Sequence, residues 1–167
     1  LTKKHKVWKM DEIIKVLIVD DQMLVRDGIT TLLDIKSDIK VVGVAEDGAD
    51  AIEKVASLKP DVILMDIRMP NMDGIEATEK ILSMNDTIKI IMLTTFDDQD
   101  YIIRSLKVGS CGYLLKDIPT SELAQAVRQA YRGIFQYSSG AMGKLVSGDM
   151  LRPPQEKQNL EEIYDIL

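Results

Sequence analysis

The apolar residues of this chain change their spacing repeatedly, and this alternation is the strongest constraint on its fold. Short continuous apolar runs, rich in β-branched residues and too short for helices, alternate with longer segments whose apolar residues recur at helical spacing. The runs predict five strands, at residues 15–20, 39–45, 61–66, 87–94 and 111–115. The segments between and after them predict five helices, at residues 23–35, 48–58, 74–84, 99–108 and 119–132.

Strands that are apolar along their whole length are typical of a parallel sheet with both faces covered by helices. Right-handed crossovers leave few topologies for five such units. We therefore expect an α/β, flavodoxin-like, doubly wound sheet of five parallel strands in the order 2-1-3-4-5, with five helices. This domain is predicted to span 13–133. A lysine-rich extension (1–12) precedes it, and a Gly-, Ser- and Pro-containing linker or truncated start of an output region (134–167) follows it.

The charge of the chain argues against direct binding of nucleic acid. The net charge is −6, but four of the 21 basic residues lie in residues 1–9, which leaves 21 − 4 = 17 basic against 27 acidic side chains in the rest. A body this acidic repels a polyanion. No apolar run approaches the roughly 18 residues of a membrane span. The single cysteine, Cys111, fits a reducing cytoplasm, where we expect the protein to reside.

Polar and charged residues stand at the ends of four of the predicted strands. Asp20 and Asp21 end the first strand and Asp66 ends the third, Thr94 ends the fourth, and Lys116 directly follows the fifth. In an open parallel sheet the functional crevice lies at the carboxyl ends of the strands. Each residue alone has an ordinary structural explanation, such as a turn aspartate or a solvated lysine. Their joint placement predicts one convergent site.

The chemistry of such a cluster is restricted. Clustered carboxylates repel one another and need a compensating cation. Oxygen ligands without a nearby His or Cys favour Mg²⁺. A carboxylate beside Mg²⁺ can attack a phosphoryl donor and become an acyl phosphate, while the metal, Lys116 and Thr94 compensate the phosphoryl charge.

Four sequence blocks resemble the signature blocks of bacterial two-component response-regulator receivers: VLIVDD, MDIRMPNMDG, LTTF and GYLLKD. The last block is similar to the NarL/FixJ subfamily, whose output is a LuxR-type helix-turn-helix, a DNA-binding domain that we expect to be absent from this chain. The resemblance implies that Asp66 is the phosphorylation site and that Lys116 pairs with a phosphate oxygen. It implies that Thr94 and Tyr113 switch on phosphorylation. The implied Mg²⁺ ligands are Asp21, Asp66, the main-chain carbonyl of Arg68, and Asp20 acting mainly through water.

The same resemblance implies the function and the partners. The domain would accept a phosphoryl group from a sensor histidine kinase and form a homodimer on phosphorylation. It would act on DNA only through an output domain, in transcription regulation, and would not contact a membrane. It would catalyse only its own phosphorylation and dephosphorylation, and so would not be a turnover enzyme. One departure is Asp117, which follows Lys116 where many receivers have proline.

Two other functions stay open at this stage. A haloacid-dehalogenase-like phosphatase also uses a nucleophilic aspartate after a strand, but it requires a second aspartate where this chain has Arg68. A degenerate receiver would act as an interaction module without phosphate, although the intact site residues argue against this. A Rossmann or P-loop nucleotide binder is disfavoured because no Gly-rich fingerprint follows the first strand.

Overall fold

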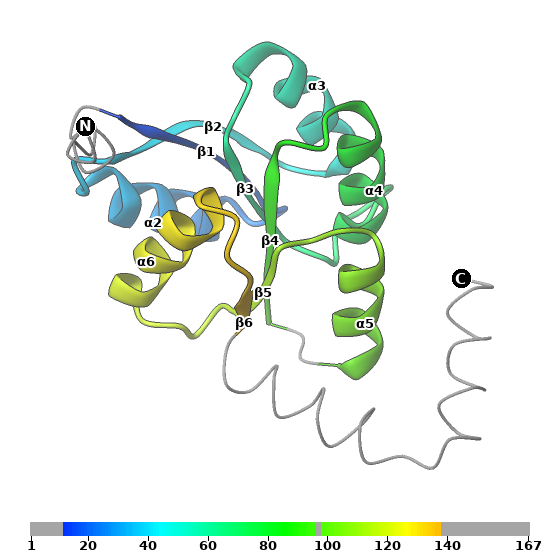
Figure 1. The fold of residues 1–167 in the computed structure, drawn as a ribbon. Helices are drawn as coiled ribbons and strands as arrows, with labels where there is room; N and C mark the ends of the chain where they lie inside the picture. The colour runs from blue at the N-terminus through cyan, green and yellow to red at the C-terminus, as the bar shows by residue number, and fades with distance from the viewer. Residues whose placement is uncertain (1–11, 96–97, 138–167) are drawn as a thin grey trace, which may run out of the picture.

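The computed structural model describes residues 12–95 and 98–137, which form one sheet flanked by helices (Figure 1). The predicted N-terminal extension, except Glu12, and most of the predicted linker lie outside these residues. The elements are β1 (Ile14–Val19), α2 (Met23–Asp34), β2 (Ile39–Ala45), α3 (Gly48–Leu58), β3 (Val62–Met65), α4 (Gly74–Met84), β4 (Lys89–Thr94), α5 (Gln99–Lys107), β5 (Gly112–Leu115), α6 (Thr120–Tyr131) and β6 (Gln136–Tyr137).

The sheet is parallel throughout, and its strand order is β2-β1-β3-β4-β5-β6. The predicted order 2-1-3-4-5 is confirmed, and so are the five helices. The predicted number of strands was wrong, because β6 extends the sheet beyond β5. A strand of two residues is too short to show any periodicity, so the sequence pattern could not reveal it. Residues 136–137, which the sequence assigned to the linker, therefore belong to the sheet.

Helices cover both faces of the sheet. In Figure 1, α2 and α6 lie on one side of the strands and α3, α4 and α5 lie on the other. Successive residues of β1 enter opposite layers: Leu17 and Val19 pack with the α3–α4–α5 side, whereas Val16 and Ile18 pack with the α2–α6 side. This double burial explains why the strands read as continuous apolar runs rather than alternating ones.

None of the helices in the described part of the chain is long and apolar enough to cross a membrane. The longest, α2 and α6, have 12 residues each. Leu33 of α2 and Val127 of α6 are fully buried against the sheet, whereas Met23 and Leu24 at the start of α2 are exposed. Because all the strands are parallel, the carboxyl ends of β1, β3, β4 and β5 lie at one edge of the sheet.

Candidate functional site

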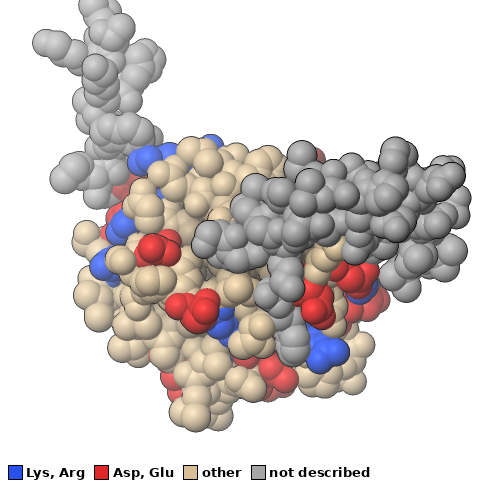
Figure 2. All heavy atoms as spheres, turned by 90° about the horizontal axis from the view of Figure 1, so that it is seen from below, with Lys and Arg blue, Asp and Glu red and all other residues tan. Residues whose placement is uncertain are grey.

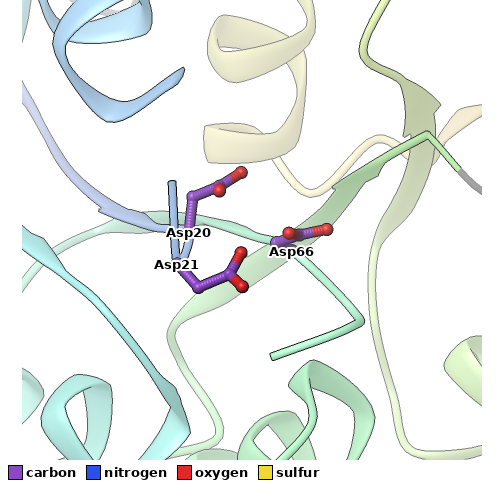
Figure 3. Close-up of side chains that lie close together, drawn as sticks. All are labelled: Asp20, Asp21 and Asp66. Carbon is purple, nitrogen blue, oxygen red and sulfur yellow. The ribbon is translucent and has the colours of Figure 1, made fainter. Parts of the chain in front are cut away.

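The strand ladder continues for one residue past β1 and β3, and this places two aspartates at the same edge. Asp20 N donates to Ala45 O (3.0 Å), and Asp66 N donates to Val19 O (2.9 Å). Both side chains are almost fully buried, whereas the neighbouring Asp21 is exposed. Figure 3 shows the three carboxylates gathered beyond the strand ends, with a ligand oxygen from each lying within 4.8 Å of the other two.

Lys116 is the cation of this cluster. Its Nζ lies 2.5 Å from Asp20 Oδ2 and 3.3 Å from Asp66 Oδ2, and its side chain is only 15% exposed. Its backbone N donates to Thr94 O (2.9 Å), which ties the end of β5 to the end of β4. The predicted convergence of these residues is therefore what the fold produces, and Thr94 lies at the same edge with a fully buried side chain.

The other two predicted residues occupy different positions. Tyr113 lies within β5 and is fully buried in the layer beneath α3, α4 and α5, rather than at the rim of the site. Arg68 follows Asp66 by two residues, and its side chain is exposed. It reaches α5, where its Nε donates to the hydroxyl of Tyr101 (2.9 Å) and its guanidinium lies 5.9 Å from the centre of the Tyr101 ring.

The electrostatics of the site favour an added cation. Burial, together with the neighbouring Asp20, raises the pKa of Asp66 above its ordinary value, although Lys116 opposes this. Burial tends to lower the pKa of Lys116, but its contacts with Asp20 and Asp66 outweigh burial, so its pKa is raised and it stays protonated. One ammonium therefore faces three carboxylates, and the ionised cluster carries a deficit of positive charge.

The donor set fits a hard divalent cation such as Mg²⁺, because all the clustered donors are carboxylate oxygens. The oxygens are not equally free to bind it. Asp20 Oδ1 accepts from Gln22 N (2.9 Å), and its Oδ2 is held by Lys116. Asp66 Oδ1 accepts from Ile67 N (2.9 Å). Asp21 is the most accessible of the three carboxylates, so it offers the simplest direct ligand.

The loop after Asp66 is held tightly against α4. A Cβ on Gly74 would lie 1.9 Å from Asp66 O, so only glycine permits this approach. Gly74 N donates to Ile67 O (2.7 Å). The side chain of Asp73 caps α4 by accepting from Glu76 N (2.8 Å). The position of the Asp66 main chain is thus fixed from both sides.

Two contacts near the site were not foreseen from the sequence. Arg26 of α2 donates from Nη1 to Asp20 O (2.6 Å) and so anchors the Asp20–Asp21 peptide. The Arg68–Tyr101 contact joins residues 33 positions apart. Nothing in the local pattern around either arginine distinguishes it from a solvated surface residue.

The face of the molecule in Figure 2 offers no continuous basic surface. Among the described residues visible there, the blue Lys and Arg side chains lie scattered among acidic and uncharged ones. This agrees with the acidic composition of the chain, and it gives no support to nucleic-acid binding through this face.

Comparison with known proteins identifies the family. The family model of the response regulator receiver domain matches residues 16–128. The transcriptional regulatory protein YxjL of Bacillus subtilis is 42% identical over 134 residues, which cover 80% of this chain and 62% of YxjL. The chain spans between 54% and 63% of the length of three such curated relatives.

Solved structures agree with this match. A LuxR-family two-component response regulator from Aurantimonas sp. SI85-9A1 superposes with a TM-score of 0.78 at 26% identity, over 81% of this chain and 97% of that one. The isolated receiver domain of RcsB from Salmonella enterica serovar Typhimurium, solved in the presence of the phosphomimetic BeF₃⁻, superposes with a TM-score of 0.74 at 26% identity, over 80% and 99% of the two chains. The chain belongs to the response regulator receiver family, a non-enzymatic signalling family whose members here include LuxR-type transcriptional regulators of two-component systems.

Proposed function

We propose that this domain accepts a phosphoryl group on Asp66 from the phosphohistidine of a sensor kinase, in a reaction that requires Mg²⁺. The observation that carries the proposal is the cluster of Asp20, Asp21 and Asp66 around Lys116 at the ends of β1, β3 and β5. A carboxylate at the centre of such a cluster can act as a nucleophile once the surrounding charge is compensated.

The transfer forms one bond and breaks one. A carboxylate oxygen of Asp66 attacks the phosphorus, the P–N bond to the donor imidazole breaks, and the imidazole nitrogen keeps the electron pair. Asp66 Oδ2 faces the Lys116 ammonium, whereas Oδ1 accepts from the Ile67 amide. We therefore assign Oδ2 as the attacking oxygen, because Oδ1 is held by the main chain.

Two side chains, Lys116 and Thr94, and a bound Mg²⁺ would then stabilise the phosphoryl group. Lys116 stays bonded to Asp20 and moves its weaker contact from Asp66 to a phosphoryl oxygen, and the Thr94 hydroxyl donates to another. Asp21, Asp66 and the main-chain carbonyl of Arg68 would hold Mg²⁺, with Asp20 contributing mainly through water. Bound there, Mg²⁺ would neutralise the charge of the phosphoryl oxygens.

Phosphorylation would change the conformation through Thr94 and Tyr113 and would favour a homodimer. The isolated receiver domain of RcsB was solved in the presence of the phosphomimetic BeF₃⁻, and this supports the proposal that a phosphoryl group acts on this domain as well. Among the described residues, the α2–α6 side carries an apolar groove of about 250 Å³ beside Lys116. Leu24, which lines the groove, is 86% exposed, and the nearby Met23 is 65% exposed. This face is our choice for the dimer contact.

We also propose the domain boundaries and the output. The receiver domain spans 13–137, because β6 pairs with β5, and residues 1–12 form an extension. The segment that follows is a linker toward an output region. Since the curated relatives are transcriptional regulators, control of DNA would pass through that output region in the cytoplasm.

The test is intact mass after incubation with acetyl phosphate, with and without Mg²⁺. We expect a gain of one phosphoryl group in the wild type with Mg²⁺, and no gain in Asp66→Ala. Asp38→Ala, which removes a carboxylate outside the site, is the matched control and should gain mass like the wild type. If neither acetyl phosphate nor a phosphorylated kinase produces a gain, the phosphate-independent interaction module would be the better reading. Repeated Mg²⁺-dependent hydrolysis of substrate phosphomonoesters would instead favour the phosphatase.

A further inference from the structure

Strand β6 is held against β5 by an unusually close backbone approach. Gln136 N donates to Cys111 O (2.9 Å), and the strands pair in parallel register with Gly112 opposite Gln136. A Cβ on Gly112 would lie 2.6 Å from Gln136 O, so any larger residue at this position would push β6 away. Glycine at position 112 is thus required for the sixth strand to pair with β5.

The second residue of β6 lies beside the tyrosine that was singled out as a switch. Tyr137 is the register partner of Tyr113, and both pack in the layer beneath α3, α4 and α5. Neighbouring strands lie about 4.8 Å apart, so the two aromatic side chains are adjacent on the same face of the sheet. Tyr113 is completely buried and therefore cannot change its position without displacing its neighbours.

The attachment of Tyr137 depends on packing. Its hydroxyl is buried and has no hydrogen-bond partner among the described residues. Burial of the phenol raises the pKa of Tyr137 to about 12. A buried hydroxyl without a partner is a cost to the docked state. The preceding Ile134 and Phe135 are 50% and 64% exposed, so they add little burial, although the Phe135 ring stacks on Tyr137 at 6.4 Å. A two-residue edge strand attached in this way has a low free energy of local opening.

At its other edge, β5 is joined to the strand that ends at the phosphoryl site. Met92 is the register partner of Tyr113, and Thr94 is the register partner of Leu115. Lys116 N donates to Thr94 O at the same end. Strand β5 therefore contacts the phosphoryl site at its carboxyl end and β6 along its free edge.

We propose that β6 is a coupling element, in which a change in the Tyr113 side chain displaces Tyr137 and loosens β6 from β5. This inference rests on the proposed function for its input, which is phosphorylation of Asp66. Its output is the chain beyond Tyr137, whose point of attachment to the sheet changes when β6 loosens. The buried hydroxyl of Tyr137, which finds no hydrogen-bond partner among the described residues, weakens the docked state, and this makes β6 responsive to a small rearrangement.

The first experiment measures amide hydrogen exchange at Gln136 in the full chain, with phosphoryl occupancy followed by intact mass. With acetyl phosphate and Mg²⁺, exchange at Gln136 should rise about tenfold in the wild type and not in Asp66→Asn. Gly112→Ala supplies the exchange level of a detached β6. A mass gain without any change at Gln136 overturns the coupling and leaves the proposed function intact. Absence of the mass gain counts against the proposed function, and the next experiment then decides the coupling.

The second experiment needs no phosphate. Tyr113→Leu should raise exchange at Gln136 about tenfold more than Leu114→Ala, which perturbs the opposite face of the same strand. Comparison at equal global stability, measured by urea unfolding, removes the contribution of whole-domain opening. Equal exchange in the two variants overturns the coupling.

A milder variant keeps the test decisive if either substitution unfolds the domain. Tyr137→Phe removes the buried hydroxyl and should lower exchange at Gln136. Tyr131→Phe is the matched control, because the Tyr131 hydroxyl does have a partner, Glu12 Oε1 (2.7 Å), and its loss should leave β6 unchanged. Unchanged or faster exchange in Tyr137→Phe contradicts the packing argument on which the coupling depends.

Discussion

Replacing the proposed nucleophile, Asp66→Asn, should make the domain more stable while it abolishes phosphoryl acceptance. Asp66 has one cation at 3.3 Å, the ammonium of Lys116, and its carboxylate lies within 4.8 Å of those of Asp20 and Asp21. The raised pKa of Asp66, caused by burial and by Asp20, shows that its environment disfavours the ionised form despite Lys116. An amide at this position removes the charge and still accepts from Ile67 N.

The expected gain in the free energy of unfolding is modest, because the attraction of Asp66 to Lys116 opposes its repulsion by Asp20 and its cost of burial. At an effective dielectric of about 20, charges 3.3 Å apart attract by about 5 kcal/mol, and like charges 4.8 Å apart repel by about 3.5 kcal/mol. The repulsion by Asp20 and the cost of burying Asp66 together exceed the attraction, while the exposed Asp21 is screened and adds little. Lys116 keeps its 2.5 Å contact with Asp20 in the variant. We expect Asp66→Asn to raise the free energy of unfolding by about 1–2 kcal/mol at pH 7.5 and low salt.

The difference in the free energy of unfolding between Asp66→Asn and the wild type should depend on pH, and the raised pKa of Asp66 decides the direction. A carboxyl whose pKa is raised in the folded state binds a proton more tightly there than in the unfolded chain. Its destabilising contribution is absent below the ordinary aspartate pKa of about 3.9, develops as the pH rises toward the raised pKa, and is complete above it. The advantage of Asp66→Asn should therefore shrink as the pH is lowered from 7.5 toward 4.

Urea unfolding followed by far-UV circular dichroism measures both the stability difference at pH 7.5 and its change with pH. Mg²⁺ should stabilise the wild type more than the variant, since ligand binding to the folded state adds RT ln(1 + [L]/Kd). Asp38→Asn is the control of opposite sign, because it breaks the contact of Asp38 with Arg128 (2.6 and 3.0 Å) and should lower stability. If Asp66→Asn proves less stable than the wild type at pH 7.5 without Mg²⁺, the electrostatic reasoning is refuted.

Three further variants test other parts of the site. Gly74→Ala should cost about 1–3 kcal/mol of unfolding free energy and reduce phosphoryl labelling, because the new Cβ displaces Asp66 O; normal labelling in the folded variant would contradict this. Lys116→Met should cost about 3 kcal/mol at pH 7.5 and slow labelling by roughly 10²-fold, measured by urea titration and timed mass spectra; unchanged labelling would remove Lys116 from the mechanism. Arg128→Met breaks a partly exposed ion pair with Asp38 far from the site, so it should cost at most about 1 kcal/mol and leave labelling unchanged.

Much of the fold was predictable from the sequence because each strand is buried on both faces. Continuous apolar runs such as 15–20 and 61–66 differ clearly from helical spacing, so the order of elements followed directly. The ends of the elements were less certain: β3 begins at Val62 rather than Asp61, and α5 ends at Lys107 rather than Val108. Helix ends depend on single hydrogen bonds, which apolar spacing does not encode.

The candidate site was predictable for a related reason. Parallel strands all end at the same edge, so residues that directly follow them, such as Asp66 and Lys116, must come together once the strand order is known. The contacts that support them were not predictable. Arg26 with Asp20, and Arg68 with Tyr101, depend on where a helix lies relative to a loop.

The sequence by itself determined the strands and helices, because periodicity is a local property. General rules for parallel sheets then predicted the strand order and the convergence of aspartates and lysine. Only the tertiary structure decided that Lys116 lies closer to Asp20 than to Asp66, and that Tyr113 lies inside the sheet. Only the tertiary structure also showed that residues 136–137 form a sixth strand. That strand exists because Gly112, 24 positions away, leaves room for it, and such a fit between distant backbones has no signature in local sequence.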